Sequence, residues 1–206
     1  MKHNGFEYID LDLPSGTKWA TRNVGANSET DYGLYFAFGE TKGYSGFTDA
    51  KKFNWGDYKF SVNGSNSKFA KYNNTDGKKV LDLCDDAAYI HMGGKWHMPT
   101  DEQIRELIKN TENIWVTDYN NSGSNGRLFT SKRNGEKLFF PACGLRFAEG
   151  YYGLNKSGHF WSSSVDNHCS DCGRDLWFGT VSISTGNGNR TCGLCVRGVF
   201  NMFWVK

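Results

Sequence analysis

Two cysteine pairs near the end of the chain have the spacing of metal ligands. Four of the six cysteines fall in the last forty residues, as Cys169-x-x-Cys172 and, nineteen residues later, Cys192-x-x-Cys195. Two such pairs at this separation are typical of a four-cysteine structural zinc site. The same side chains could instead form disulfides or stay as free thiols, so the spacing alone allows three states.

The strands predicted around these pairs argue against zinc. The residue pattern predicts strands over 158–164, 176–183 and 195–205. In a meander of these strands, the middle one separates the two cysteine pairs by roughly 26 Å, at about 3.3 Å per residue. Zinc–sulfur bonds of about 2.3 Å do not bridge that distance. We therefore expect no metal, and a zinc- or disulfide-stabilised structural or adhesion domain remains the alternative.

Other reactive groups do not form a recognisable catalytic set. His168 stands beside Cys169, but neighbours in a loop seldom face each other, and no third orienting group is identifiable. The polar stretch 118–126 lacks the spaced carboxylates that calcium prefers, and no Glu-Pro-Asn or Gln-Pro-Asp tripeptide is present. Gly186-x-Gly188 is not a dinucleotide fingerprint. We expect a non-catalytic protein without a cofactor.

The composition is that of one globular domain built mainly from strands. Among 206 residues, 38% are hydrophobic and 16% aromatic, with 25 glycines and 3 prolines. A net charge of +2 gives no long-range attraction for nucleic acid. No run of 18 apolar residues predicts a membrane span, and the start of the chain has no apolar signal core. We therefore expect neither nucleic-acid binding nor membrane insertion.

Two helices are predicted in the first half of the chain. Asp85 or Asp86 can cap a short helix that ends near Gly93-Gly94. Thr100 and Gln103 form a capping box for a second helix, which ends near Asn110. Residues 41–79 show no helical period and are expected to form a long irregular surface segment, ordered by its aromatic side chains.

Strands are predicted before and after these helices. Alternation of apolar and polar residues predicts the first, and turn signals such as Gly186-Asn187-Gly188 separate the later ones. This order of elements predicts an α+β fold without βαβ units. Besides the three strands already given, the predicted strands cover 9–13, 18–21, 34–38, 113–117, 126–131 and 137–141.

Seven segments, in order along nearly the whole chain, resemble a bacterial and phage family with the C-type lectin fold. This family includes the Fibrobacter-type major paralogous domains and the variable proteins of diversity-generating retroelements. The chain departs from the family at Cys195 and Gly198, where Ser and Pro are frequent. The matching segments are YIDLDLPSGTKWATRNVGA (8–26), GLYFAFGET (33–41), DDAA (85–88), GGKWHMPT (93–100), FFPACGLR (139–146), GHFWSSS (158–164) and RTCGLCVRGV (190–199).

The resemblance implies a fold in which both chain ends pair in one sheet, two helices flank the sheets, and the C-terminal strands display a binding surface. Retroelement variable proteins bind protein or other macromolecular ligands, which implies a cell surface or a phage particle as location. The fold also occurs in enzymes that oxidise a sulfatase cysteine with paired cysteines. The surroundings of Cys192 and Cys195 do not match such a site, so we expect no enzyme.

The composition of the last fifty residues agrees with retroelement diversification. Mutating the adenines of an AAC codon never yields Lys, Glu, Gln, Met or Trp. Residues 157–205 contain no Lys, Glu or Gln, although the first 156 contain 15 Lys, 8 Glu and 1 Gln. At that rate roughly 7 or 8 would be expected in this stretch. Strands also disfavour long charged side chains, which is the plainer explanation.

The sequence therefore predicts a scaffold over 1–164, a variable binding region over 165–195 and a closing strand over 196–206, in one domain. Trp177 and Arg174 are expected to be the main anchors, because Trp and Arg dominate interface hot spots. Small polar residues around them would supply adaptable hydrogen bonds. The complete predicted site is Asp166, Asn167, His168, Ser170, Asp171, Gly173, Arg174, Asp175, Trp177, Thr180, Asn187, Asn189, Thr191 and Leu194.

Overall fold

Strands from both halves of the chain share the first sheet. The computed structural model describes residues 1–45, 51–148 and 150–202. Within them, Val199 pairs with Trp19 in antiparallel register, so the end of the chain closes the sheet that its start begins. The strands, in sheet order, are β1 (Lys2–His3), β2 (Phe6–Ile9), β3 (Lys18–Ala20) and β14 (Val199–Phe200).

Two expected strands differ here from the structure. The first strand is β2, which ends at Ile9, whereas the predicted strand over 9–13 is irregular backbone. Leu11 and Leu13 are nevertheless buried, so their alternation reflects packing without strand pairing. The closing strand predicted over 195–205 is broken into β13 and β14, and its last residues lie outside the described part. Gly198 separates the two pieces, and a Cβ there would lie 2.6 Å from the Met92 sulfur.

Both predicted helices are confirmed. The first, α1 (Ala87–Met92), starts at Asp86, whose side chain accepts a hydrogen bond from the Tyr89 amide. The second, α2 (Asp101–Asn110), has the complete capping box of Thr100 and Gln103. Three short 3₁₀ helices accompany them: η1 (Trp55–Asp57), η2 (Leu83–Asp85) and η3 (Tyr119–Asn121).

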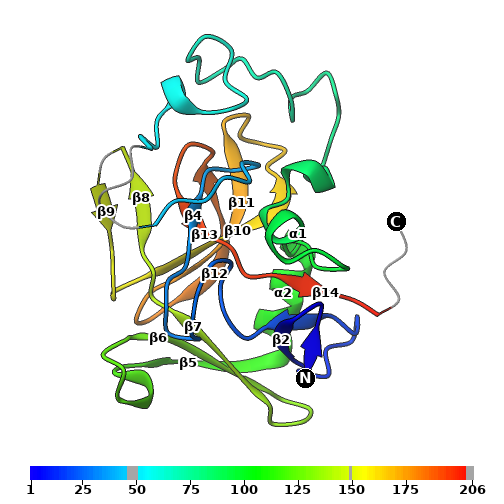
Figure 1. Cartoon of the computed structure of the whole chain (residues 1–206), viewed down its shortest axis with the longest axis vertical. Coiled ribbons are helices and arrows are strands. Elements are labelled where there is room, and N and C mark those ends of the chain that lie inside the picture. Colours follow the sequence, from blue (N-terminus) through cyan, green and yellow to red (C-terminus); the bar gives the residue numbers. More distant parts are fainter. Residues whose placement is uncertain (46–50, 149, 203–206) are drawn as a thin grey trace.

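The central sheet carries the region predicted to bind. Helix α2 packs against its strands β10, β11 and β12. In Figure 1 this sheet runs through the middle of the molecule, with both helices and β14 on one side of it. The strands, in sheet order, are β12 (Ile183–Asn189), β11 (Cys172–Phe178), β10 (Gly158–Val165), β13 (Leu194–Cys195) and β4 (Tyr35–Phe36).

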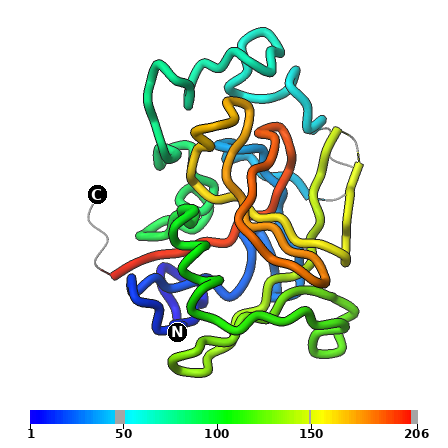
Figure 2. Tube along the Cα trace, turned by 180° about the vertical axis from the view of Figure 1, so that it is seen from behind, coloured from blue at the N-terminus to red at the C-terminus, as the bar shows by residue number. Residues whose placement is uncertain are grey.

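Two smaller sheets and one hydrophobic core complete an α+β fold. Figure 2 shows the three-stranded sheet at the end of the molecule opposite to the long irregular segment. Buried side chains from Leu11 to Phe200 belong to one cluster. None of the helices in the described ranges is long and apolar enough to cross a membrane. The remaining strands are β5 (Thr111–Val116), β6 (Gly126–Ser131), β7 (Lys137–Pro141), β8 (Leu145–Phe147) and β9 (Gly150–Tyr152).

The irregular segment after residue 50 is held by aromatic burial and by one acidic side chain. Phe53, Tyr58 and Tyr72 are buried in the common core. Asp85 is also buried, and it accepts hydrogen bonds from Lys59 at 2.6 Å and from the Tyr72 hydroxyl at 2.6 Å. The expectation of an irregular segment ordered by aromatic residues is confirmed for its described part.

The cap of α1 predicts a pH dependence of stability. Burial raises the pKa of Asp86 to about 6, although amide hydrogen bonds, including those from Tyr89 and Met98, oppose the shift. Because the folded pKa exceeds the unfolded one, the stabilisation is complete below about pH 4 and is lost as the pH rises through about 6. We expect the stability of wild type relative to Asp86→Asn to fall by about 2 kcal/mol from pH 4 to pH 7. Urea unfolding of both proteins between pH 4 and pH 7 measures this change. A difference in unfolding free energy that stays constant with pH would contradict the prediction.

Candidate ligand-binding surface

One face of the central sheet gathers side chains suited to binding. Directly paired residues of antiparallel strands lie on the same face of a sheet. His159, Trp177 and Ser184 form one such row across β10, β11 and β12, and Asp175 and Gly186 belong to the next row. Five residues from three strands are thereby brought together.

A groove of about 400 Å³ lies at this sheet, and two glycines of β12 line it. At Gly186, an added Cβ would lie 2.8 Å from the Asp175 Oδ1, and at Gly188 it would lie 2.9 Å from the Trp161 ring. A side chain at either position would overlap these groups, so the glycines let Asp175 and Trp161 pack against β12. The groove is lined by Leu145, His159, Asp175, Trp177, Ser184, Thr185, Gly186, Asn187, Gly188, Asn189, Cys192 and Leu194.

The groove combines an aromatic ring with a buried carboxylate. Trp177 is 36% exposed, and Asp175 is only 4% exposed. The Asp175 Oδ1 has no hydrogen-bond partner among the described residues, and its Oδ2 lies 3.7 Å from the Nδ1 of His159. No Lys or Arg lines the groove. A buried acceptor without a donor favours a ligand group that carries N–H or O–H, and the indole ring adds apolar contact.

The residue types of a nucleophilic triad are present in the groove, but their electrostatics oppose that chemistry. Cys192, His159 and Asp175 all line it. Burial and the Asp175 carboxylate raise the pKa of the Cys192 thiol to about 11. A nucleophilic cysteine requires the opposite shift, toward the thiolate. The groove is therefore better suited to binding than to covalent catalysis.

The four cysteines near the end of the chain form one disulfide and leave two free thiols. Cys169 and Cys172 form a disulfide, so their sulfurs are not thiolate ligands. Cys195 is buried near Cys143, and burial raises the pKa of its thiol well above the usual value. Among the described residues, no group of metal-ligand type combines the two cysteine pairs.

The two cysteine pairs are not separated by the length of a strand, contrary to the prediction. We predicted a single strand over 176–183, whereas β11 ends at Phe178 and β12 begins at Ile183. Cys172 pairs with Asn189, so both cysteine pairs lie at the same end of this hairpin. The reasons against a four-cysteine zinc site are instead the disulfide between Cys169 and Cys172 and the burial of Cys195.

The loop before β11, residues 166–171, is organised by a buried acid. Asp166 is 6% exposed and accepts hydrogen bonds from the amides of His168 at 2.7 Å and Cys169 at 2.9 Å. Burial alone would raise the pKa of Asp166, but these amides and Arg174 hold it below its ordinary value. The predicted ligand contact at Asp166 is corrected to a scaffold position within the loop.

The predicted anchor Arg174 is engaged inside the protein. Its guanidinium lies 3.2 Å from Asp166 Oδ2 and 3.4 Å from Asp101 Oδ1, at the start of α2. Arg174 and Asp175 are successive residues of β11, and successive side chains of a strand point to opposite faces of the sheet. The Arg174 side chain therefore lies on the face opposite to Asp175. Arg174 therefore ties the loop to α2, and Trp177 is the anchor that the structure leaves accessible.

The other predicted site residues separate into three groups. Asp175, Trp177, Asn187, Asn189 and Leu194 line the groove, although Leu194 and Asp175 are buried. Exposed loop positions are Asn167, His168 and Ser170, with Asp171 half-buried beside them. Three residues belong to neither surface: Thr191 is buried, Gly173 is packed against Phe38, and Thr180 lies in the hairpin turn between β11 and β12.

Seven groove residues lie outside the predicted site: Leu145, His159, Ser184, Thr185, Gly186, Gly188 and Cys192. For Cys192 the sequence allowed a zinc ligand, a disulfide or a free thiol. The signal for the groove was the Ser-x-Gly-x-Gly pattern of 184–188, which has small residues at every second position. We predicted a turn there, whereas the structure has a strand, because alternate glycines admit Asp175 and Trp161 against β12.

Comparison with protein-family models, with curated proteins and with solved structures found no match to this chain.

Proposed function

We propose that this chain is a macromolecule-binding domain with a C-type lectin fold, of the kind that diversity-generating retroelements vary. Its recognition surface comprises the groove and the exposed loop residues Asn167, His168 and Ser170. The observation that carries the proposal is the groove itself, in which accessible Trp177 stands beside a buried acceptor. The pairing of β14 with β3 and the two flanking helices agree with the fold that the seven segments imply.

The residue types at exposed and buried positions support the proposal that a diversity-generating retroelement varies this surface. The exposed loop residues are all types that a mutated AAC codon can encode. Trp177 is not such a type and would be a fixed member of the surface. Trp161 is not such a type either, and it is fully buried in the scaffold of the same sheet. The loop and the groove meet where β11 begins and β12 ends, so a ligand can contact fixed and variable residues together.

The disulfide Cys169–Cys172 supports a location outside a reducing compartment. It closes residues 169–172, which contain Ser170 and directly follow Asn167 and His168, and so limits the conformations that ligand binding must order there. A bacterial cell surface or a phage particle, as implied by the family resemblance, would provide such a location. The partner is then a protein or another macromolecule on a facing surface.

A binding screen tests the proposal. The purified chain is assayed against arrayed bacterial surface proteins and polysaccharides, and each ligand found is titrated again with Trp177→Ala. We expect the affinity to fall at least about tenfold, since a Trp hot spot contributes about 2 kcal/mol or more. Combined replacement of Asn167, His168 and Ser170 by Ala should also weaken binding.

The matched control is Val181→Ala. Val181 is 90% exposed in the hairpin turn and lies outside the groove. Its replacement should leave every affinity unchanged. Ligands whose binding is insensitive to Trp177 and to the loop, but is lost on changes elsewhere, would contradict the proposed surface.

A further inference from the structure

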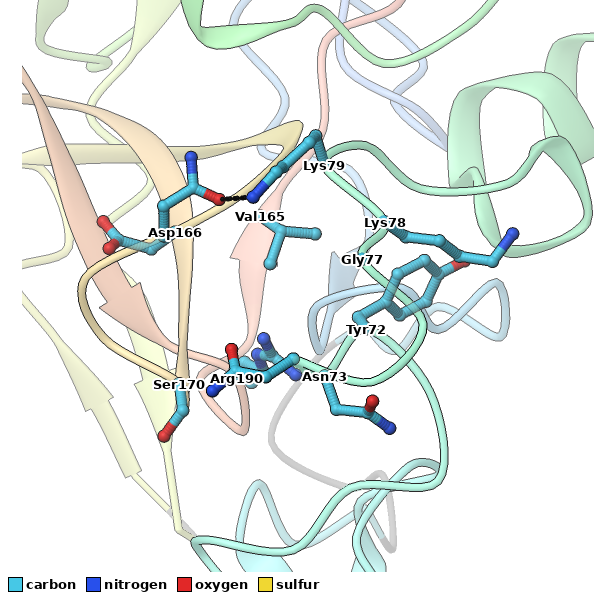
Figure 3. A pocket seen from close by; sticks show the side chains of 11 residues that line it. Tyr72, Asn73, Gly77, Lys78, Lys79, Val165, Asp166, Ser170 and Arg190 are labelled. Carbon is cyan, nitrogen blue, oxygen red and sulfur yellow. Dashed lines mark hydrogen bonds between the residues drawn. The ribbon is translucent and has the colours of Figure 1, made fainter.

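A second, smaller pocket lies beside the loop and away from the groove. It has a volume of about 100 Å³ and is formed between residues 72–79 and residues 165–170. Figure 3 shows the side chain of Arg190 at its centre, between the loop that carries Ser170 and the one that carries Asn73. The pocket is lined by Tyr72, Asn73, Asn74, Gly77, Lys78, Lys79, Val165, Asp166, Asn167, Ser170 and Arg190.

Arg190 is a buried cation that forms no ion pair with the carboxylates of the described residues. It is 1% exposed, and its Nε donates to the Cys172 carbonyl at 3.2 Å. Its Nη1 has no hydrogen-bond partner among the described residues. The carboxylates of Asp171 and Asp76 attract the guanidinium without forming an ion pair with it among the described residues, and the Tyr58 hydroxyl also interacts with it. The rings of Phe69 and Phe38 lie 4.7 and 5.8 Å from the guanidinium carbon and compensate only part of its lost hydration.

Lys79 adds a second positive charge at the rim, and no carboxylate of the described residues forms an ion pair with it. Its ammonium group donates to the Asn167 Oδ1 at 2.9 Å, a neutral acceptor, and it is exposed. The other charges of the pocket are already paired, because Lys78 binds Asp82 and Asp166 binds Arg174. The net charge left in the pocket is positive.

Uncharged donors complete the lining. The hydroxyl of Ser170 and the amide of Asn74 are exposed at the rim. The volume suits a group of a few heavy atoms, such as a carboxylate or a phosphate. Arginine binds such oxyanions through planar, charge-assisted hydrogen bonds, and lysine adds a point charge.

We propose that the pocket between residues 72–79 and 165–170 binds a small oxyanion, with Arg190 and Lys79 as its cationic ligands. The oxyanion is either free in solution or carried by a macromolecule as an acidic side chain or a phosphate group. The pocket shares Asn167 and Ser170 with the proposed recognition surface, but the inference rests on Arg190 and Lys79 and does not depend on the groove or on the proposed function.

Titration with sodium acetate and with sodium phosphate, at constant ionic strength in chloride, tests the site. Backbone amide shifts in NMR spectra of the full chain report the binding. We expect saturable shifts at Ser170, Asn74 and Lys79 at millimolar concentrations, as for a site with a few charged hydrogen bonds. A lower Kd for acetate would indicate that the natural ligand group is a carboxylate. A lower Kd for phosphate would indicate a phosphoryl group.

Three variants decide the assignment. Lys79→Gln should weaken binding about tenfold, and Arg190→Met should abolish it. Lys137→Gln, which removes an equal charge from an exposed position of β7, should bind like wild type. Because Lys79 is exposed, its variant stays informative even if Arg190→Met fails to fold. The absence of saturable shifts with both anions, or equal affinity of Lys79→Gln and wild type, would overturn the inference.

Discussion

Replacing Asp166 by Ala is expected to lower the melting temperature by about 6–12 °C. The buried carboxylate satisfies the amides of His168 and Cys169 and pairs with Arg174. Its removal leaves two amides and part of a guanidinium charge without their acceptor, which costs about 3 kcal/mol. For a chain of this size, 1 kcal/mol corresponds to about 2–4 °C. Differential scanning calorimetry measures the change.

The neighbouring residue provides the control. Asn167 is exposed, and Lys79 is the one hydrogen-bond donor that the described residues offer its side chain. Asn167→Ala should cost at most about 0.5 kcal/mol and leave the melting temperature within about 2 °C of wild type. Equal effects of the two substitutions would show that Asp166 does not organise the loop as described.

Two tryptophans on the same sheet face should differ strongly in their contribution to stability. Trp161 is fully buried, and its Nε1 donates to the Phe36 carbonyl at 2.7 Å. Trp161→Ala should therefore cost about 3–5 kcal/mol and lower the melting temperature by about 10 °C. Trp177 stands at the groove, and Trp177→Ala should cost about 1 kcal/mol while removing the anchor for binding.

Chemical unfolding of both variants, followed by circular dichroism, measures this difference. Urea midpoints at equal slope give the two free energies directly. If Trp177→Ala destabilises the chain as much as Trp161→Ala, then Trp177 belongs to the core, and the groove loses its proposed anchor.

Local signals in the sequence were sufficient to predict both helices and most strands outside the binding region. The capping box at Thr100 and the acid at Asp86 mark helix starts, because they satisfy amides that the helix leaves free. Strands 126–131 and 137–141 were predicted with their observed bounds. In contrast, Leu11 and Leu13 alternate like strand residues but pair with no strand, because tertiary packing alone buries them.

The binding region was harder to predict because its glycines have a tertiary role. Turn chemistry suggested that 186–188 reverses the chain, whereas the glycines there admit Asp175 and Trp161. The observed strand bounds differ from the predicted ones. As a result both cysteine pairs lie at one end of the hairpin, and His159 pairs with Trp177. The buried positions of Asp166, Gly173 and Thr191 depend on contacts with distant residues, which the local pattern does not contain. Exposed Asn167, His168 and Ser170 were correctly placed outside the core.

Sequencing this gene from many independent isolates tests the central claim most directly. We predict that amino-acid changes concentrate at Asn167, His168, Ser170 and other exposed positions of the recognition surface, in codons that derive from AAC by adenine mutation. Trp161 and Asp166, which belong to the scaffold of the same region, should stay unchanged. Changes spread evenly along the chain, or as frequent at these two residues as at the exposed positions, would contradict a fixed scaffold that carries a variable binding surface.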